Sequence, residues 1–408
     1  MKKSDFYAVF GGFGPQNWVN IRKPDISGKA DGITTCIMDG ETGTLQIVSQ
    51  SHGITSPSTL VVSNDNRFIY AGNETHDYKV RGYGGGVTSF SFDMKTGATA
   101  PLNENFAFGS ATAYTSLDRT GRFLFVANCG SKFYVSRYER NSVGKLEPMV
   151  IRDEGVVCMF EVLEDGRIGD VVDRLVLSGT GADPVEHASA HPHSVLVDDQ
   201  DYIIIPNKGG DDVYVAKLNR NARRMELLCV TKCTYGSSPR HVAFVPGTDF
   251  VLIQEEFGAH LNSFRLDRNT GRLEPVSRVD TYDPDFDKPK SEFCGVSFSR
   301  PWGIDVQVHP NGRWIYCNNT QPVVCQFEID RRSGELRLIG TFDGVAKTMT
   351  RGIQIDKYGR FLVATATLDD KAIVYRLDSD TGNPVYASQI DLPTPTAVRF
   401  IYPKEGSL

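Results

Sequence analysis

Residues 191–218, HPHSVLVDDQDYIIIPNKGGDDVYVAKL, and residues 237–257, SSPRHVAFVPGTDFVLIQEEF, show one structural unit written twice. Each copy opens with a polar cluster that contains histidine, continues into a short apolar strand, turns at a small or acidic pair and enters a second apolar strand. Alternating apolar and polar positions over roughly four to eight residues, with turn residues between the runs, are typical of antiparallel strands. The two stretches are therefore predicted to be neighbouring β-meanders with ionisable side chains at their strand ends.

The unit recurs along the chain as a turn followed by a strand that begins with an aromatic residue. The intervals from Tyr202 to Phe250 and from Trp314 to Phe361 are 48 and 47 residues, and insertions lengthen the others. A repeat of about 40 to 50 residues suits the four-stranded blade of a β-propeller. The six copies are NDNRFIYAGN (64–73), RTGRFLFVAN (119–128), DDQDYIIIPN (198–207), PGTDFVLIQE (246–255), PNGRWIYCNN (310–319) and KYGRFLVATA (357–366).

A second set of turns, out of phase with the first, indicates seven blades. The additional blade is explained by the chain ends: FYAVFGG (6–12) begins where a second strand is expected, and PTPTAVRF (393–400) ends where a first strand is expected. Sharing one blade between the termini pairs strand edges that would otherwise be exposed. The turns are Asp39–Gly43, Asp93–Gly97, Glu164–Gly166, residues 218–227, Asp267–Gly271, Asp330–Gly334 and Asp378–Gly382.

We therefore predict an all-β fold, a single seven-bladed β-propeller domain over residues 1–408, with one blade closed by the N- and C-terminal strands. Hydrophobic residues make up 40% of the chain and charged residues 23%, which is ordinary for a globular protein. A net charge of −6 argues against a nucleic-acid or anionic-membrane partner.

No apolar run reaches the length of a membrane span, and the N-terminal apolar run is too short for a secretory signal, so we expect a cytoplasmic protein. The eight cysteines form no CxxC pair, and we expect buried thiols.

Three insertions interrupt the repeat, at residues 129–156, 170–190 and 278–300. The third gathers Asp280, Asp283, Asp285 and Asp287, and clustered carboxylates can bind calcium. Because the glycine and the terminal glutamate of a known calcium loop are missing from their offsets, we expect a solvated acidic loop instead.

Several motifs together resemble the seven-bladed lactonase family, which includes propeller-type 6-phosphogluconolactonase and 3-carboxy-cis,cis-muconate lactonizing enzyme. They are HPHS (191–194) before the 201–218 strand pair, SSPRHVAF (237–244), the acidic Glu256, and TRGIQIDKYGRFL (350–362). The chain departs from the family pattern at Asn207, often aspartate there, and at Glu255-Glu256-Phe257, where the family has Asn-Glu-Leu. The resemblance implies four active-site residues in the central channel: His193, Arg240, Glu256 and Arg351.

The positions of these residues in the repeat support a shared site. Arg240 and Arg351 each lie ten residues before the aromatic of their blade, and His193 and His241 lie nine before theirs. Since the first strand of every blade lines the channel, these positions form a ring at one mouth. Two guanidinium groups there suit a carboxylate or phosphate, and imidazole suits general-base work near neutral pH.

We accordingly expect catalysis by His193 as base, Glu256 as its acid or orienting partner, and Arg240 and Arg351 as an anion clamp. His191 and His241 are further candidates for substrate binding. The expected substrate is a small anionic lactone that is hydrolysed with no metal or other cofactor. The same clamp would serve a muconate-like substrate in a cycloisomerase, so the sequence leaves hydrolysis and cyclisation open, as it does the oligomeric state.

Two other function classes remain. A metal-dependent sugar lactonase would use Glu256 and Asn319 as candidate ligands, although the paired arginines oppose it. A non-enzymatic propeller scaffold is the other class, since fold alone does not decide function. The asparagines that end several second strands are expected to bind nearby backbone; these are Asn73, Asn128, Asn207 and Asn319.

Overall fold

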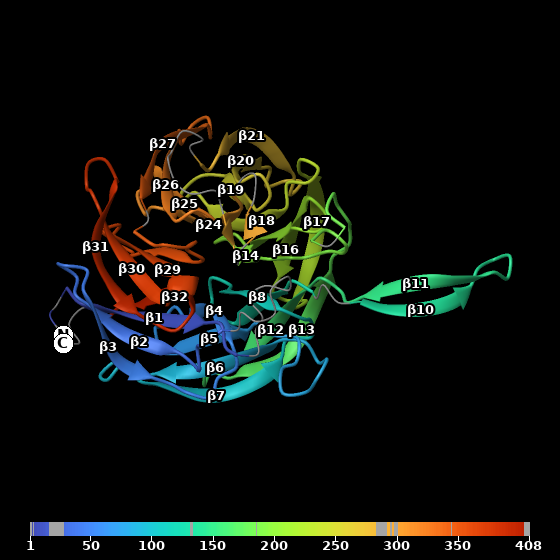
Figure 1. Ribbon diagram of the computed structural model, residues 1–408, viewed down its shortest axis with the longest axis horizontal. Helices are drawn as coiled ribbons and strands as arrows, with labels where there is room; N and C mark the ends of the chain where they lie inside the picture. The colour runs from blue at the N-terminus through green and yellow to red at the C-terminus, as the bar shows by residue number, and fades with distance from the viewer. Residues whose placement is uncertain are drawn as a thin grey trace.

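In the computed structural model, four-stranded antiparallel sheets surround a central axis like the blades of a propeller (Figure 1). The described part of the chain holds seven such sheets, as predicted. The structure describes residues 2, 4–15, 28–130, 134–184, 186–282, 292–293, 296–297, 301–343 and 345–403.

The strands follow the repeat. The blade shared by the termini contains Pro395–Ile401 (β32), Phe6–Gly12 (β1), Thr34–Met38 (β2) and Leu45–Gln50 (β3). The next three blades contain Pro57–Val62 (β4), Phe68–Asn73 (β5), Gly86–Phe92 (β6) and Thr99–Phe106 (β7); Thr112–Leu117 (β8), Phe123–Asn128 (β9), Val156–Val162 (β12) and Ile168–Val176 (β13); and Leu196–Val197 (β14), Tyr202–Asn207 (β15), Asp212–Asn219 (β16) and Arg224–Lys232 (β17). The last three contain Pro239–Phe244 (β18), Phe250–Glu255 (β19), His260–Leu266 (β20) and Leu273–Asp280 (β21); Gly303–Val308 (β24), Trp314–Asn319 (β25), Val323–Ile329 (β26) and Leu336–Asp343 (β27); and Ile353–Ile355 (β28), Phe361–Ala366 (β29), Lys371–Leu377 (β30) and Pro384–Asp391 (β31).

The shared blade closes the ring as the sequence predicts. Strand β32 is antiparallel to β1, with Ala8 opposite Phe400 and Val9 opposite Arg399. The ring of Phe400 packs edge-on against Phe6 at 5.3 Å between centroids. Segments nearly 400 residues apart in sequence therefore form one sheet and one hydrophobic cluster.

The repeated aromatics pack between blades. Five of the six are buried, and Phe68 is half-buried. Two turn glycines show why a side chain does not fit beside these rings, because a Cβ at Gly166 would lie 2.2 Å from the ring of Phe68, and one at Gly382 2.5 Å from that of Trp314. Both glycines have a positive φ, a backbone conformation that residues with a Cβ rarely adopt. In both cases the turn of one blade packs on the aromatic of the preceding blade.

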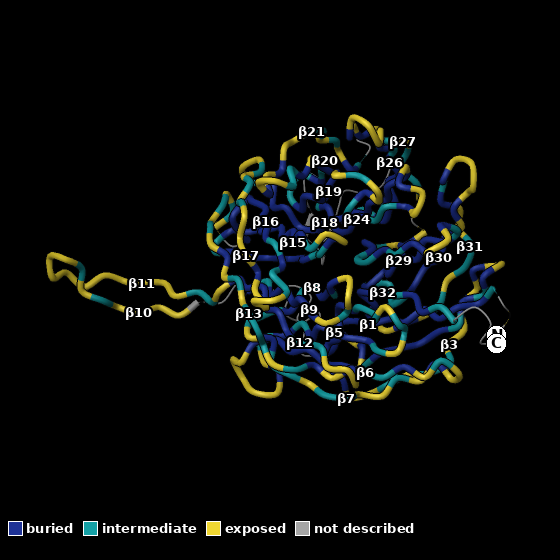
Figure 2. Tube along the Cα trace, turned by 180° about the vertical axis from the view of Figure 1, so that it is seen from behind, coloured by how far each residue is buried: buried dark blue, intermediate teal, exposed yellow. Residues whose placement is uncertain are grey.

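The first insertion contains a separate two-stranded sheet. Tyr134–Arg140 (β10) and Leu146–Arg152 (β11) form a hairpin that projects from the ring (Figures 1 and 2). A second small pair, Glu292–Phe293 (β22) and Val296–Ser297 (β23), lies in the 278–300 insertion.

Three of the four aspartates in the acidic insertion, Asp283, Asp285 and Asp287, lie outside the described residues. Asp280 is described, and its carboxylate lies 3.2 Å from His260 Nε2. Helical structure in the described chain amounts to the 3-10 turn Thr367–Asp369 (η1), and no helix there has the length and apolar character to cross a membrane.

Candidate functional site

A ring of side chains surrounds the central channel where the innermost strands begin. For every one of the six aromatics, at least one of the residues nine and ten positions before it lines this channel. They enclose a cavity of about 40 Å³, room for a small number of water molecules. The lining residues are Ser58, Thr59, Glu74, Ala113, Tyr114, His193, Arg240, His241, Asp305, Arg351, Gly352, Ile353, Thr396, Ala397, Val398 and Arg399.

Bulges at the start of the inner strands explain how neighbouring residues share the channel. Successive side chains of a regular strand point to opposite faces, yet Arg240 and His241 both line the cavity. The pairing of β18 with β19 shifts register between Pro239 and His241, and similar shifts occur at the start of β4, β8 and β24. An extra residue in a bulge re-aims the side chains beside it.

Arg240 is buried and held by charged neighbours. Its Nε lies 2.9 Å from Glu256 Oε2, and its Nη1 donates to the carbonyl of Ile304. Burial lowers the pKa of Arg240, and the negative charge of Glu256 opposes that shift. Glu256 follows β19 directly, so the end of one strand fixes a guanidinium that comes from the start of its neighbour in the same blade.

Lys208 is a charged neighbour of the site that the sequence analysis missed. Its ammonium Nζ donates to Glu256 Oε1 at 2.8 Å and lies 3.9 Å from Glu186 Oε2, with all three residues buried. Burial lowers the pKa of Lys208, but the attraction of Glu256 and Glu186 outweighs it, so the net shift is upward. Glu256 is therefore paired with two cations, which favour its charged form.

His241 and Asp305 form a second buried pair that the sequence analysis did not propose. His241 Nδ1 lies 2.7 Å from Asp305 Oδ1, and Nε2 lies 3.1 Å from Arg240 Nη1. Because a guanidinium can only donate, Nε2 must accept and Nδ1 must carry the proton. Burial, followed by the charge of Arg240, lowers the pKa of His241 to about 4, which agrees with this neutral form. His241 thus positions Arg240.

His193 lines the same cavity and lies in the segment before β14. Its ring centroid is 5.3 Å from that of His241, and its Nδ1 is buried with no hydrogen-bond partner among the described residues. Burial, and after it the positive charges of Arg240 and Lys208, hold the pKa of His193 well below its usual range. The imidazole is therefore neutral at pH 7, and after burial the neighbours that act most strongly on it are cationic.

Arg351 precedes β28 and faces the cavity from another blade. Its Nη2 lies 3.8 Å from Glu74 Oε1, and its guanidinium lies 4.6 Å from the centre of the Phe13 ring. The two arginines therefore line one cavity while pairing with different carboxylates. His191 lies apart from the cavity-lining residues, with Nδ1 against the carbonyl of Cys129 and its backbone N–H donating to Asn207 Oδ1.

The strand-end asparagines bind backbone, but their side-chain N–H groups donate to loops distant in sequence and not to local turns. Asn319 Nδ2 donates to the carbonyl of Thr281 at 2.7 Å, and its Oδ1 accepts from the N–H of Gln321. This candidate metal ligand is thus engaged in holding a loop. The structure shows no cluster of three or more His, Cys, Asp or Glu with metal-binding geometry in the described ranges. The other three asparagines donate to Thr55, Ala107 and Ser178.

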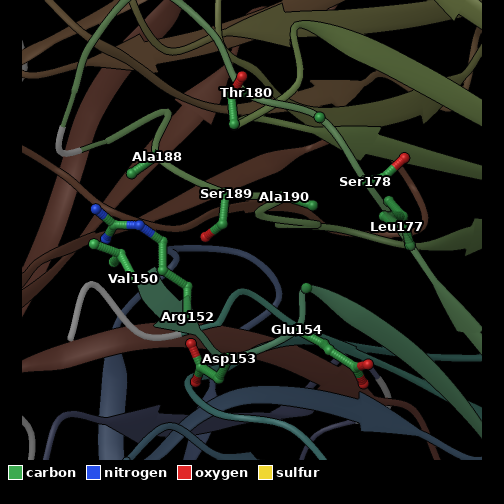
Figure 3. Close-up of a pocket in the computed structure, with 12 residues that line it drawn as sticks. Val150, Arg152, Asp153, Glu154, Leu177, Ser178, Thr180, Ala188, Ser189 and Ala190 are labelled. Atoms are coloured by element: carbon green, nitrogen blue, oxygen red, sulfur yellow. The ribbon is translucent and has the colours of Figure 1, made fainter. Parts of the chain in front are cut away.

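A larger pocket of about 420 Å³ lies outside the channel, between the base of the β10–β11 hairpin and the segment after β13. Figure 3 shows its polar side chains, among them Arg152, Asp153, Ser178 and Ser189. None of the residues proposed from the sequence lines it.

The fold and the channel mouth define a β-propeller with buried histidine, arginine and carboxylate groups at one end of its axis. Residues 23–400 match the model of the family described as "Lactonase, 7-bladed beta-propeller", and the chain belongs to this family.

The chain is similar to curated and solved proteins over most of its length. It is 23% identical over 362 residues to the 6-phosphogluconolactonase of Formosa agariphila, covering 86% of this chain and 90% of the relative. It is 22% identical over 377 residues to the 6-phosphogluconolactonase of Bacillus subtilis, covering 92% and 96%. The structure of the periplasmic gluconolactonase of Pseudomonas aeruginosa superposes with a TM-score of 0.79 at 22% identity, covering 98% of this chain and 100% of that one.

Proposed function

We propose that this protein hydrolyses a small anionic lactone, of the 6-phosphogluconolactone type, at the channel mouth. The observation that carries the proposal is a neutral His193 with an unpartnered Nδ1 in the same cavity as the guanidinium groups of Arg240 and Arg351. A buried ring nitrogen without a hydrogen-bond partner is unfavourable unless a ligand satisfies it. The names of the two curated relatives also favour hydrolysis over muconate cyclisation.

In this proposal His193 is the general base. It removes a proton from water as the water oxygen attacks the lactone carbonyl, and the ring C–O bond then breaks. The departing alkoxide takes the proton back from the imidazolium, which leaves a hydroxy acid and a neutral His193. Proton transfer of this kind contributes about 10²- to 10⁴-fold to the rate.

Arg240 is proposed to stabilise the oxyanion that develops on the carbonyl oxygen. Glu256 at Nε and His241 at Nη1 hold its guanidinium in place, and preorganised donors are most effective in a site from which water is excluded. In this assignment Glu256 positions Arg240 and keeps its charge. Asp305, through His241, supports the same guanidinium from the other side.

Arg351 is proposed to bind the phosphate or carboxylate of the substrate. Its ion pair with Glu74 is long, 3.8 Å, and its side chain is 19% exposed, so a stronger anion can displace the carboxylate. Because Arg240 and Arg351 both line the cavity, an anionic ligand is favoured over a neutral one.

The test is a panel of lactones, from neutral to carboxylated and phosphorylated, assayed for ring opening and for ring closure of muconates. We expect ring opening of the anionic lactones. When Arg351 is replaced by lysine, we expect a raised KM and an unchanged kcat, because lysine keeps the charge but loses the bidentate fork. Ring closure without ring opening would support the cycloisomerase. Equal rates on neutral and anionic lactones would contradict the anion clamp.

We also propose a cytoplasmic location. The seven cysteines that the structure describes are free thiols, and disulfides form mainly in oxidising compartments. Because the similar structure from P. aeruginosa is named periplasmic, cell fractionation is the measurement that decides. Recovery of the protein with periplasmic markers would contradict this location.

A further inference from the structure

The β10–β11 hairpin, residues 134–152, is an arm that the propeller does not need. Asn128 at the end of β9 lies opposite Val156 at the start of β12, so the blade is complete without the inserted residues. The arm extends away from the ring, and most of its length is exposed (Figures 1 and 2). Neither strand pairs with any blade in the described chain.

The arm exposes apolar side chains that ordinary surface strands avoid. Val135 is 66% exposed and Tyr138 64% exposed. An isolated two-stranded hairpin is marginally stable in water, whereas a sheet of three or more strands with an apolar face is stable. The other exposed apolar residues of the arm are Val143, Leu146, Met149, Val150 and Ile151.

One edge of the arm is open to further pairing. Strand β11 carries Pro148, which lacks an N–H and interrupts an edge. Strand β10, with the sequence YVSRYER, contains neither proline nor glycine and offers a continuous row of backbone groups. An added strand would therefore join the edge of β10.

Strand β10 is also complementary in charge to a copy of itself. Arg137 and Glu139 lie on the same face of the strand, with Arg137 Nε 3.0 Å from Glu139 Oε1. When two such strands pair antiparallel around a twofold axis at Tyr138, a residue that lies a given number of positions before Tyr138 in one copy faces the residue that lies the same number of positions after Tyr138 in the other. Arg137 then faces Glu139 of the second copy, and Glu139 faces Arg137 of the second copy. The two Tyr138 residues face each other.

We propose that the arm joins two copies of this protein through antiparallel pairing of their β10 strands. The product is a four-stranded sheet in the order β11, β10, β10 of the second copy, β11 of the second copy, centred on Tyr138. Two opposite-charge pairs and one aromatic pair form across the new edge, each of a kind that stabilises antiparallel sheets. The contact is isologous, so it closes at two copies and does not propagate.

Charge reversal tests the register. Arg137→Glu and Glu139→Arg each place like charges opposite each other twice, and we expect the dimer dissociation constant, measured by analytical ultracentrifugation, to rise about tenfold or more. The double variant Arg137→Glu/Glu139→Arg restores opposite charges and dimerises. A mixture of the two single variants also restores both pairs, so it forms a heterodimer although each variant alone is weakened. Arg140→Glu is the matched control, because residue 140 faces the uncharged Ser136 of the second copy.

Cross-linking tests the axis independently. Two cysteines introduced by Tyr138→Cys face each other within the Cα separation that a disulfide allows, so mild oxidation yields a covalent dimer on a non-reducing gel. Ser136→Cys, in the same strand, faces Arg140 and yields far less. A wild-type protein that is monomeric at high micromolar concentration, or equal cross-linking at positions 136 and 138, would overturn the proposal. Binding of a different protein to the arm, with this chain remaining monomeric, would also overturn the proposal.

Discussion

At the scale of single residues, a chain of alternating charges ends at Arg240 in the channel mouth. Glu186, Lys208, Glu256 and Arg240 follow one another at ion-pair distances, and all are buried. Removing charge from water is unfavourable, and a buried pair is tolerated only when each member is satisfied. We propose that their common function is to hold Arg240 charged and in a fixed position at the cavity that His193 also lines.

Replacement of Lys208 by methionine tests that function. The change leaves Glu256 with one cation, and breaking a buried pair costs about 3 to 5 kcal/mol, so the free energy of unfolding should fall. The charge of Lys208 also lowers the pKa of His193. Its loss should raise that pKa and move the acid limb of kcat/KM to higher pH.

Lys208→Arg keeps the charge and is the matched control. It should retain the wild-type position of the acid limb, measured as the pH at which kcat/KM falls to half. An acid limb at the same pH in Lys208→Met would show that Lys208 does not act on His193.

His193→Ala tests the proposed base. We expect kcat to fall by about 10² to 10⁴ while the fold is retained. In the wild type, burial and neighbouring cations depress the pKa of His193, so the neutral, active form persists below pH 6.5 and the rate is lost only as the pH falls further. An alanine variant with wild-type kcat would place the base elsewhere.

Much of the channel mouth can be predicted by counting along the repeat. His193, Arg240 and Arg351 stand out because their distances to the blade aromatics agree. The same count reaches Asp305, nine residues before Trp314, and Lys208, which stands six residues after Tyr202 as Glu256 stands six after Phe250. These signals are present in the sequence. The bulges are not, because they depend on backbone pairing between strands.

At the scale of elements, a turn glycine of one blade packs against an aromatic ring of the preceding blade at several places around the ring. Gly382 has φ of +73°, and a Cβ there would lie 2.5 Å from Trp314 Cδ2. The turn glycine and the aromatic that mark the repeat in the sequence therefore contact each other across neighbouring blades.

Gly382→Ala should lower the free energy of unfolding by about 2 to 4 kcal/mol. Roughly 1 kcal/mol comes from the left-handed backbone and the rest from overpacking against Trp314. Gly121→Ala is the control, since Gly121 has φ of +69° but no atom within 4 Å of the place that an alanine Cβ would take. Urea denaturation of both variants separates the two effects. Equal losses would show that the ring contact contributes nothing.

The arm marks the limit of prediction at this scale. Residues 129–156 are recognisable as an insertion without helical periodicity. Their sequence does not distinguish a loop from a hairpin, because a two-stranded sheet with mixed faces has no regular apolar alternation. Register, and with it the self-complementarity of Arg137 and Glu139, comes only from the structure.

At the scale of the whole molecule, the propeller depends on its last strand. Strand β32 pairs with β1, packs beside β4 and contributes Thr396, Ala397, Val398 and Arg399 to the channel. The sequence predicts this closure correctly because a split blade leaves one half-pattern at each end of the chain. No local propensity could show it, since the partners are separated by almost the full length of the protein.

A chain ending at Asp391 should lose stability out of proportion to the residues removed. Val398, Phe400 and Ile401 are buried, and burying a large apolar side chain contributes about 1.5 to 3 kcal/mol. Their removal alone approaches the total stability of a typical domain, about 5 to 15 kcal/mol. It also exposes the edge of β1, which invites aggregation.

A chain ending at Pro403 is the matched control for this truncation, because it retains all of β32. The two chains are compared by soluble yield and by Tm. The longer chain should match the full-length protein, whereas the chain ending at Asp391 should be insoluble or melt at a much lower temperature. If the shorter chain were soluble with an unchanged Tm, the ring would not require the C-terminal strand for closure. The residues of β32 that line the channel would then be needed for the site but not for the fold.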